Sequence, residues 1–387
     1  MVAAVRKGRS RRSVATDFGV AVRTVRRWVA HAGEARLDRV DWSGRRGGRR
    51  EAQATAVRTE NLILDLRKEL RETSDLGEFG AAALHRELLS RSKTLSLPRI
   101  PSVRTIGRIL ERRGALDGQR RTRRPAPPSG WYLPEVRERR AELDSFDIVE
   151  GLVIKGGHNV EVLNGISLHG GLSMSRVSET ITSKKTVDSL LEHWRGFGVP
   201  DYAQFDNDTI FQGAHQWPDT FGRVTRLCLQ LEIIPVFAPP RETGFQASIE
   251  SYNGRWQAKV WQRFLHASRT DLTRQSDRYV AACHQRSASR IESAPSRWEI
   301  PADWTFDLSR SLAGTVIFIR RTNDRGHVKL LGHDYDVSSR WCNRLVRCDV
   351  DLTKGRIRIY QLRRRTPTQQ PLLKSMPYEV PRRRFQR

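Results

Sequence analysis

Three carboxylates in this sequence stand where they could bind a metal ion together. Asp144 opens an apolar run, Asp206 follows the short apolar segment 202–205, and Glu250 begins a stretch with helical spacing. Carboxylate oxygens are the ligands that Mg²⁺ prefers in proteins. Two such ions can activate an attacking oxygen and stabilise a leaving oxygen in an in-line displacement at phosphorus. We therefore expect Asp144, Asp206 and Glu250 to form one catalytic metal site.

The elements around these acids favour their convergence. Asp206 comes after a buried strand, so it projects from the carboxyl end of a sheet, where open α/β sheets bind ligands. Asp144 begins the first and central strand. Glu250 lies off the apolar stripe of its helix, which consists of Ile249, Trp256, Val260 and Phe264. One acid on each of three elements is an arrangement suited to hard divalent cations.

Two neighbouring acids offer alternatives. Asp147 competes with Asp144, since it lies on the opposite face of the same strand. We favour Asp144, mainly on the family resemblance given below. Asp208 either caps a turn after Asp206 or assists the metal ligands, and we favour the cap.

The pattern of residues 140–300 predicts an α/β domain. Its order is three strands, helix, strand, helix, strand, helix. We expect strands over 146–154, 160–168, 172–181, 202–205 and 233–237, and helices over 186–197, 221–231 and 247–265. The segment Lys155-Gly156-Gly157-His158 predicts a hairpin turn between the first two strands.

The charge of the chain indicates a polyanionic partner. The 387 residues include 69 Lys and Arg against 43 Asp and Glu, a formal net charge of +26. Nucleic acid is favoured over an anionic membrane, because no apolar run approaches the roughly 20 residues of a spanning helix. The four cysteines are scattered and form no Cys-x-x-Cys pair, which is typical of reduced thiols in a cytoplasmic protein. With nucleic acid as the partner, we expect association with the nucleoid.

Residues 1–42 predict a helix-turn-helix domain for binding DNA. Val14, Ala15 and Phe18 line one helix and Gly19 permits the turn. The second helix carries three candidate DNA-binding residues, which are Arg23, Arg26 and Arg27. The alternative is a small packing module with a solvated basic face.

A second helix-turn-helix domain is predicted over residues 55–116. Its last helix starts at Ser102, a plausible N-cap, and presents Arg104 and Arg108 to DNA. We interpret 43–54 as a basic, Gly-rich linker and 117–139 as a basic, Pro-rich linker.

Beyond residue 311 the sequence turns β-rich. Short strands are predicted at 315–320, 326–331, 335–337, 344–350 and 356–362. We interpret 311–362 as a small β-barrel and 363–387 as a poorly packed basic tail.

Three acidic motifs of this sequence resemble those of a known protein family. The segments Leu143-Asp144, Phe205-Asp206-Asn207 and Glu250-Ser251-Tyr252-Asn253-Gly254-Arg255-Trp256 resemble the acidic motifs of DDE transposases with a retroviral-integrase-type catalytic core. The resemblance extends to the order of domains and is closest to bacterial insertion-sequence transposases. The chain departs from the family pattern in three ways. Asp208 stands where the family usually has glycine, 43 residues separate Asp206 from Glu250, and Ile166-Ser167-Leu168-His169-Gly170 replaces the usual Asp-x-x-Ser-Arg.

The resemblance implies a fold, a reaction and its partners. The core would be ribonuclease H-like, with two Mg²⁺ or Mn²⁺ ions at Asp144, Asp206 and Glu250. The reaction would cleave transposon ends and transfer strands to target DNA, so the partner is double-stranded DNA. A homo-oligomer, dimer or larger, is expected because two ends must be joined.

Three further side chains on the Glu250 helix are candidate DNA contacts. Asn253 and Gln257 would touch the DNA end, and the alternative of ordinary surface polar residues is equally weighted. Lys259 would touch backbone phosphate, or only solvent.

Two other functions are kept as alternatives. One is a DNA-binding accessory or regulatory protein with an inactive core, which the complete set of acids disfavours. The other is a metal-dependent nuclease without strand transfer. A tyrosine recombinase is excluded because we find no arrangement of a catalytic Tyr with an Arg-His-Arg set.

Overall fold

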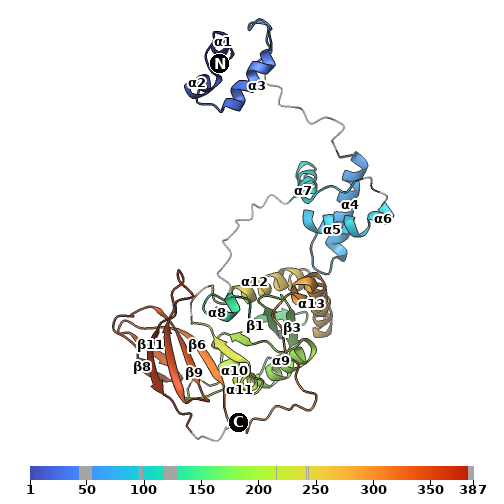
Figure 1. The fold of residues 1–387 in the computed structure, drawn as a ribbon. Helices are drawn as coiled ribbons and strands as arrows, with labels where there is room; N and C mark the ends of the chain where they lie inside the picture. Colours follow the sequence, from blue (N-terminus) through green and yellow to red (C-terminus); the bar gives the residue numbers. More distant parts are fainter. Residues whose placement is uncertain are drawn as a thin grey trace.

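A computed structural model describes residues 1–42, 55–95, 97, 99–116, 130–214, 216–240, 242 and 244–381. The predicted linker 43–54, most of the predicted linker 117–139 and the end of the basic tail lie outside these residues. The described part of the chain is a mixed α/β structure with a large central sheet, preceded by two groups of helices (Figure 1).

The predicted core strands are present, in a sheet whose strand order is β3-β2-β1-β4-β5 over this region. Their bounds are β1 Leu143–Ile154, β2 His158–Ser167, β3 Ser173–Ser178, β4 Tyr202–Phe205 and β5 Ile234–Phe237. β1, β2 and β3 run antiparallel, whereas β4 lies parallel to β1 and β5 parallel to β4. The hairpin between β1 and β2 turns through Gly156 and Gly157, which both have positive φ. Parallel pairing brings the carboxyl ends of β4 and β5 to the same edge.

Helices cover both faces of this sheet (Figure 1). One face packs on a core that includes Phe146, Trp194 and Leu227, from β1 and from two of its covering helices. The helices of this core are α9 Ser183–Phe197, α10 Thr209–Gln212 and α11 Arg223–Gln230. The other face packs on a core that includes Val149 and Trp256. The helices of that core are α12 Ala247–Trp256, the π-helical turn η2 Gln257–Trp261 and α13 Arg269–Glu292.

Helix α13, with 24 residues, is absent from the sequence prediction, which placed the last core helix at 247–265. The predicted helix 247–265 corresponds to α12 and η2. The chain then turns back and forms α13. Few residues of α13 are buried, and these include Leu272, Ser276 and Tyr279. Because so few of its residues are apolar and buried, α13 shows only a weak repeat of apolar residues at helical spacing. The sequence pattern therefore did not indicate this helix.

The C-terminal strands extend the central sheet, and the predicted separate barrel is not confirmed. Their bounds are β6 Thr315–Arg321, β7 His327–Leu330, β8 His333–Asp336, β9 Leu345–Asp351, β10 Arg356–Gln361 and β11 Leu372–Pro377. β6 pairs in parallel with β5, and the sheet continues through β9, β10 and β11 to nine strands. β7 and β8 form a separate hairpin. Short strands and turns look alike in a barrel and in a sheet extension, so the sequence pattern could not separate them.

Described residues of the predicted linker 117–139 and of the predicted poorly packed tail 363–387 belong to helices and strands of the fold. The tail 363–387 contributes β11, which pairs with β10. The end of the predicted linker 117–139 forms α8 Pro134–Arg137, and Trp131, Tyr132 and Val136 are buried against Phe245 and the sheet. Burial of these large side chains removes apolar surface from water, so the Pro-rich composition misled the linker prediction.

Each group of N-terminal helices has a small core of its own. The first group comprises α1 Val2–Arg6, α2 Arg11–Asp17 and α3 Val22–Ala32, and the second comprises α4 Val57–Thr73, α5 Ala81–Ser90, α6 Ser92–Leu95 and α7 Val103–Arg112. Gly19, with positive φ, allows the turn between α2 and α3. Phe18 is not a core residue, since 54% of it is exposed. The Ser102 hydroxyl accepts a hydrogen bond from the Thr105 amide and caps α7, as predicted.

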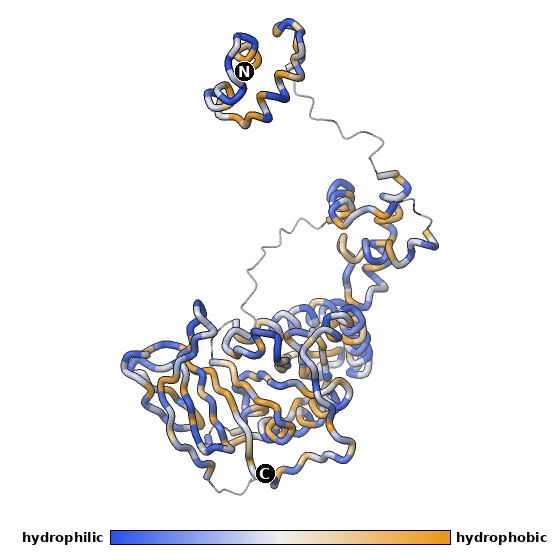
Figure 2. Tube along the Cα trace, viewed as in Figure 1, coloured by the Kyte–Doolittle hydropathy of each residue, from blue (hydrophilic) through white to orange (hydrophobic). Residues whose placement is uncertain are grey.

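Apolar residues concentrate in the strands and on the inner faces of the covering helices (Figure 2). In the described ranges, no helix combines the length and the apolar character that crossing a bilayer requires. All four cysteines are free thiols, and Cys228 and Cys348 are buried.

Candidate active site

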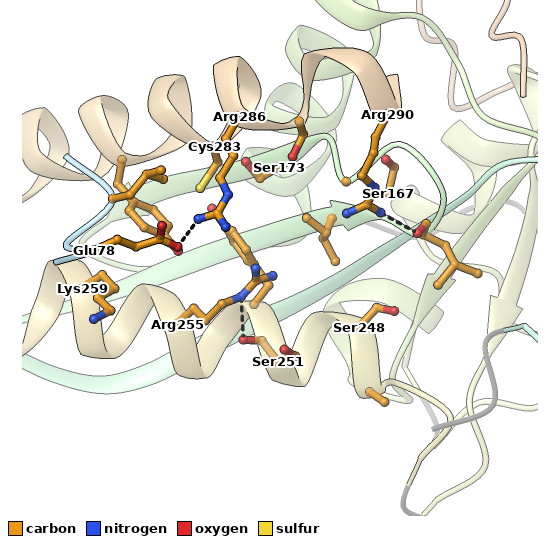
Figure 3. Close-up of a pocket in the computed structure, with 18 residues that line it drawn as sticks. Glu78, Ser167, Ser173, Ser248, Ser251, Arg255, Lys259, Cys283, Arg286 and Arg290 are labelled. Atoms are coloured by element: carbon orange, nitrogen blue, oxygen red, sulfur yellow. Dashed lines mark hydrogen bonds and ion pairs between the residues drawn. The ribbon is translucent and has the colours of Figure 1, made fainter. Parts of the chain in front are cut away.

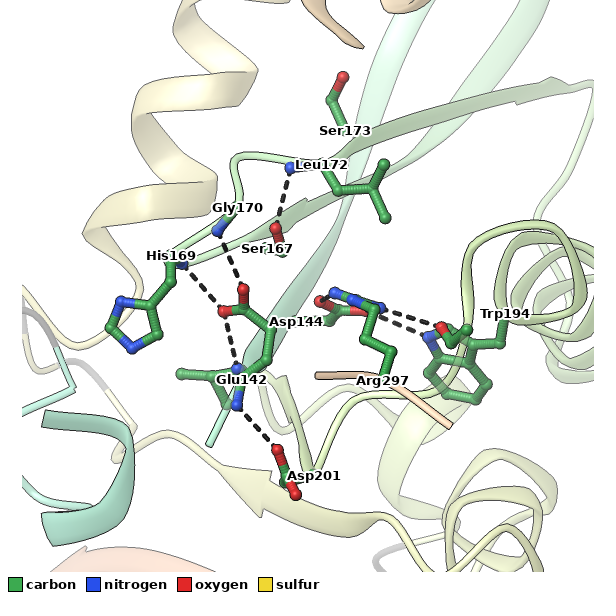
Figure 4. A network of polar contacts seen from close by, with 12 residues as sticks. Glu142, Asp144, Ser167, His169, Gly170, Leu172, Ser173, Trp194, Asp201 and Arg297 are labelled. Carbon is green, nitrogen blue, oxygen red and sulfur yellow. Dashed lines mark hydrogen bonds and ion pairs between the residues drawn. The ribbon is translucent and has the colours of Figure 1, made fainter. Parts of the chain in front are cut away.

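Asp144 lies in the protein interior and is already paired. The residue is 1% exposed, and Arg297 forms an ion pair and two hydrogen bonds with its carboxylate. The indole Nε1 of Trp194 donates to Oδ2 of Asp144 at 3.2 Å (Figure 4). Burial alone would lower the pKa of Arg297, but the charge of Asp144 raises it. These contacts engage both carboxylate oxygens of Asp144 with groups of the protein itself.

A second buried carboxylate extends this network. Glu142 accepts hydrogen bonds from the backbone amides of His169 and Gly170, both at 2.9 Å, and its own amide donates to Asp201 (Figure 4). The loop that follows β2 is thereby tied to the start of β1. This loop is the sequence stretch where the family motif is missing.

Asp147, three residues further along β1, faces the opposite side of the sheet. Strand alternation puts Asp144 on the side of Phe146 and Trp194, whereas Asp147 shares its side with Val149, which packs on helix α12. The parallel register pairs Asp144 with Ala203. Three residues further along both strands, Asp147 comes level with Asp206.

The electrostatics join Asp147 to the other two acids. Its pKa is raised from 3.8 to about 6, first by burial and then by the negative charges of Asp206 and Glu250. Hydrogen bonds from the Ile148 amide and the Asn253 side chain act in the opposite direction. Asp147, Asp206 and Glu250 therefore form one interacting cluster of charges, which we call the acidic cluster.

The second acid sits in a local turn that fixes it. Asp206 directly follows β4, and its Oδ1 accepts a hydrogen bond from the Asp208 amide at 2.9 Å. Asp208 caps helix α10, accepting a hydrogen bond from the Ile210 amide at 2.7 Å. The cap that the sequence favoured for Asp208 is thus confirmed.

Glu250 is exposed on the first turns of α12, and Asn253 lies one turn further on. The Asn253 amide donates to Oδ2 of Asp147 at 2.7 Å and accepts from Asn164 at 2.8 Å. Asn164 also accepts a hydrogen bond from Ser175. Both ends of the Asn253 side chain are therefore hydrogen-bonded within the protein, and one of its partners is Asp147.

The donor set of the acidic cluster fits a divalent cation that retains water. In the part of the chain that the structure describes, no three His, Cys, Asp or Glu side chains lie close enough to form a preassembled metal site. The carboxylates of the cluster nevertheless repel one another. Mg²⁺ keeps several waters and takes one or two carboxylates with substrate phosphate, and the carboxylates of Asp147 and Asp206 are donors of that kind.

We predict that stability without metal depends on pH through Asp147. Its pKa is about 6 in the folded protein and near 3.8 when unfolded. The folded state therefore holds this proton more tightly, and the stabilising contribution present below pH 4 is lost as pH rises through about 6. The loss amounts to about 3 kcal/mol at most. The difference in free energy of unfolding between wild type and Asp147→Asn in EDTA measures it, and a flat difference from pH 4 to 7 contradicts it.

The predicted DNA-binding arginines of the N-terminal helices point to solvent. Arg23, Arg26 and Arg27 are exposed on α3. Arg104 and Arg108 are exposed on α7. Arg27 also lies over the ring of Trp28, 5.4 Å from its centroid. All five guanidinium groups are on exposed residues, where phosphate could reach them.

Gln257 and Lys259 lie at the end of the α12 helix. Gln257 is half-buried in the π-helical turn. The ammonium of Lys259 donates to the Gly77 carbonyl at 2.9 Å and lies over the Phe79 ring. The structure thus places Lys259 against the second group of helices, where the sequence predicted a phosphate or solvent contact.

This contact belongs to an interface between the second group of helices and the core. Arg278 pairs with Asp75 at 2.6 Å, and Arg286 pairs with Glu78. A pocket of about 480 Å³ lies beside this interface, between α12 and α13 (Figure 3). It opens on the face of α12 that carries Ser251 and Arg255, away from Glu250.

Arg263 completes the interface by capping a helix end. Its guanidinium donates to the carbonyls of Arg71, Glu72 and Ser74, at the C-terminus of α4. These carbonyls have no partners within the helix and carry the negative end of its dipole. A cation from the core therefore holds the second group of helices at a defined position next to α12.

We predict that Arg263→Ala loosens this docking. Charge-assisted hydrogen bonds of this type contribute about 1.5–3 kcal/mol each, so amide hydrogen exchange should rise at least tenfold over residues 71–79. The matched control is Arg274→Ala, which removes an exposed arginine paired with Asp271 on its own helix. Unchanged exchange in Arg263→Ala would show that the cap does not hold the interface.

Solved structures that resemble this chain are retroviral integrases. The HTLV-2 integrase catalytic core domain in complex with magnesium, in its dimeric form, is 13% identical with a TM-score of 0.27, covering 36% of this chain and 82% of that one. A simian T-cell lymphotropic virus intasome in complex with a PP2A regulatory subunit is 13% identical with a TM-score of 0.32, covering 78% and 96%. The BIV integrase catalytic core is 15% identical with a TM-score of 0.26, covering 35% and 80%.

The described part of the chain is a mixed α/β structure with a large central sheet. No family model and no curated protein matches the sequence. At these identities and TM-scores the matches carry no argument about activity. Any activity has to be inferred from the chemistry of the acidic cluster instead.

Proposed function

We propose that this protein is a DNA transposase of the DDE type, which cleaves transposon ends and joins them to target DNA. The observation that carries the proposal is the acidic cluster. β1 supplies Asp147, the end of β4 supplies Asp206, and α12 supplies Glu250, at the edge where parallel strands end. Acids from three elements at this edge suit phosphoryl transfer with divalent ions.

Each residue of the cluster has a distinct task. Asp147 and Asp206 hold Mg²⁺ or Mn²⁺, and Asn253 fixes the carboxylate of Asp147. Glu250, which is exposed, completes the ligands when DNA is present. When bound there, two divalent ions would lower the pKa of the attacking hydroxyl or water and stabilise charge on the leaving oxygen.

The basic surface supplies the DNA contacts. The exposed arginines of α3 and α7, which are Arg23, Arg26, Arg27, Arg104 and Arg108, bind transposon-end DNA. The excess of 69 basic over 43 acidic residues attracts target DNA without regard to sequence. Because two ends are joined in one reaction, the active form is a homo-oligomer, a dimer or larger.

The test is incubation of the protein with the DNA flanking its own gene, with Mg²⁺, followed by mapping of cut and joined strands. We expect 3′-hydroxyl ends at the element boundary and products in which these ends are joined to target strands. Cleavage without joining would support the alternative of a nuclease. Binding without cleavage would support an accessory or regulatory protein.

A further inference from the structure

A guanidinium from the C-terminal part of the sheet reaches the residue that follows Asp206. Arg320 lies near the end of β6. Its NH2 group donates to Oδ1 of Asn207 at 2.8 Å, and its NH1 group donates to the carbonyls of Ile319 at 2.9 Å and Ala238 at 3.4 Å. The same Ala238 carbonyl accepts a hydrogen bond from the Asn207 amide at 2.6 Å.

These contacts join the ends of three parallel strands. Asn207 follows β4, Ala238 follows β5, and Arg320 belongs to β6. One side chain thus connects these strand ends at the edge of the sheet where ligands bind in open α/β folds. Because β6 begins the extension beyond the core strands, the extension contributes directly to the loop that carries Asp206.

The partners of Arg320 differ from those of Arg297 and Arg347, two other half-buried arginines of the sheet region. Arg297 pairs with Asp144, and Arg347 pairs with Asp349. Within the described ranges, Arg320 forms no ion pair with a carboxylate, and its hydrogen-bond acceptors are neutral oxygens. It also lies over the Phe318 ring. Burial lowers the pKa of Arg320 to about 10, so it remains charged near pH 7.

A buried charge without an opposite charge costs folding free energy. A methionine would fill similar volume without that cost, so stability alone gives no reason for arginine at this position. The multiple donors of a guanidinium can, however, hold Asn207 and Ala238 together, which neither methionine nor the compact ammonium of lysine can reproduce.

We propose that Arg320 is a positioning residue of the active site, which fixes the loop carrying Asp206 by holding Asn207 against the end of β5. This inference rests on the proposed metal site and adds a role for the C-terminal strands. Arg320 acts through Asn207 and not by touching the reacting atoms. Removing Arg320 therefore lets the Asp206 carboxylate adopt a wider range of positions, which weakens metal binding.

The test compares Arg320→Met, Asn207→Ala and the double variant, with Arg321→Met as the matched control. Arg321 is the next residue on β6, more exposed, and paired with Glu242. We expect Arg320→Met to keep or raise Tm in EDTA while Mn²⁺ affinity falls at least tenfold. Asn207→Ala should cause the same loss, and the double variant should be no worse than either single variant. Arg321→Met should keep wild-type Mn²⁺ affinity.

Amide hydrogen exchange separates this inference from the proposed function. Without metal or DNA, Arg320→Met should raise exchange over residues 206–212 at least tenfold, and Arg320→Lys should raise it less. Unchanged exchange, or losses of Mn²⁺ affinity that multiply in the double variant, would overturn the inference. If exchange rises as expected but wild type neither cuts nor joins DNA, the proposed function fails while the positioning role stands.

Discussion

Replacing Asp147 with asparagine is expected to abolish DNA cleavage and strand joining while binding of DNA persists. Asp147 is the acid of β1 that interacts with Asp206 and Glu250. Loss of a carboxylate that holds a catalytic cation should remove about 4 kcal/mol of transition-state stabilisation, a rate loss of about a thousandfold. Asp206→Asn should behave in the same way. Gel assays of cleavage and joining with Mg²⁺, beside a binding assay in EDTA, measure both effects.

A control on the same strand separates chemistry from folding. Glu150 is exposed three residues after Asp147, and Glu150→Gln should leave cleavage within a few-fold of wild type. Asp147→Asn should unfold at the same or a higher temperature, because the amide cannot be repelled by the other two acids. Cleavage by Asp147→Asn within tenfold of wild type would rule out its role as a metal ligand.

Replacing Asp144 with asparagine should cost stability and not metal binding. The change leaves the buried guanidinium of Arg297 without its counter-charge. Breaking a buried ion pair on one side typically costs about 3–5 kcal/mol. Denaturant unfolding should show a loss of that size, and Mn²⁺ affinity of the folded protein should stay close to wild type.

Two comparisons sharpen this expectation. Glu179→Gln breaks the exposed pair with Arg269 and should cost no more than about 1 kcal/mol. The double variant Asp144→Leu with Arg297→Met removes both charges and should recover most of the lost stability. If folded Asp144→Asn lost Mn²⁺ affinity while its stability stayed unchanged, Asp144 would be a metal ligand after all.

The choice between Asp144 and Asp147 shows where sequence reasoning stopped. Alternation along a strand places the two acids on opposite faces, which follows from the sequence alone. The sequence could not tell which face would carry the helix of Glu250. That depends on the path of the chain after β5, which packs Ile249 of α12 on the side of the sheet that carries Val149. The partner of Asp144, Arg297, lies 153 residues away, and no local pattern indicates it.

Local sequence patterns predicted individual strands and helices better than they predicted how these elements pair and pack. The strands of the core and β6 to β10 were predicted within a few residues, because alternation and Gly-rich turns are local, whereas β11 was missed. Membership of β6 and β9 in the central sheet depends on pairing across distant segments. The same limit applies to Arg320 and to the docking by Arg263, since each contacts groups far away in the sequence.

We propose that Asp147, and not Asp144, binds metal together with Asp206. The most direct measurement is the anomalous diffraction of Mn²⁺ in crystals of the protein bound to DNA. We predict a peak between the carboxylates of Asp147 and Asp206, with Glu250 facing it. A peak beside Asp144, or none near Asp147, would contradict the account.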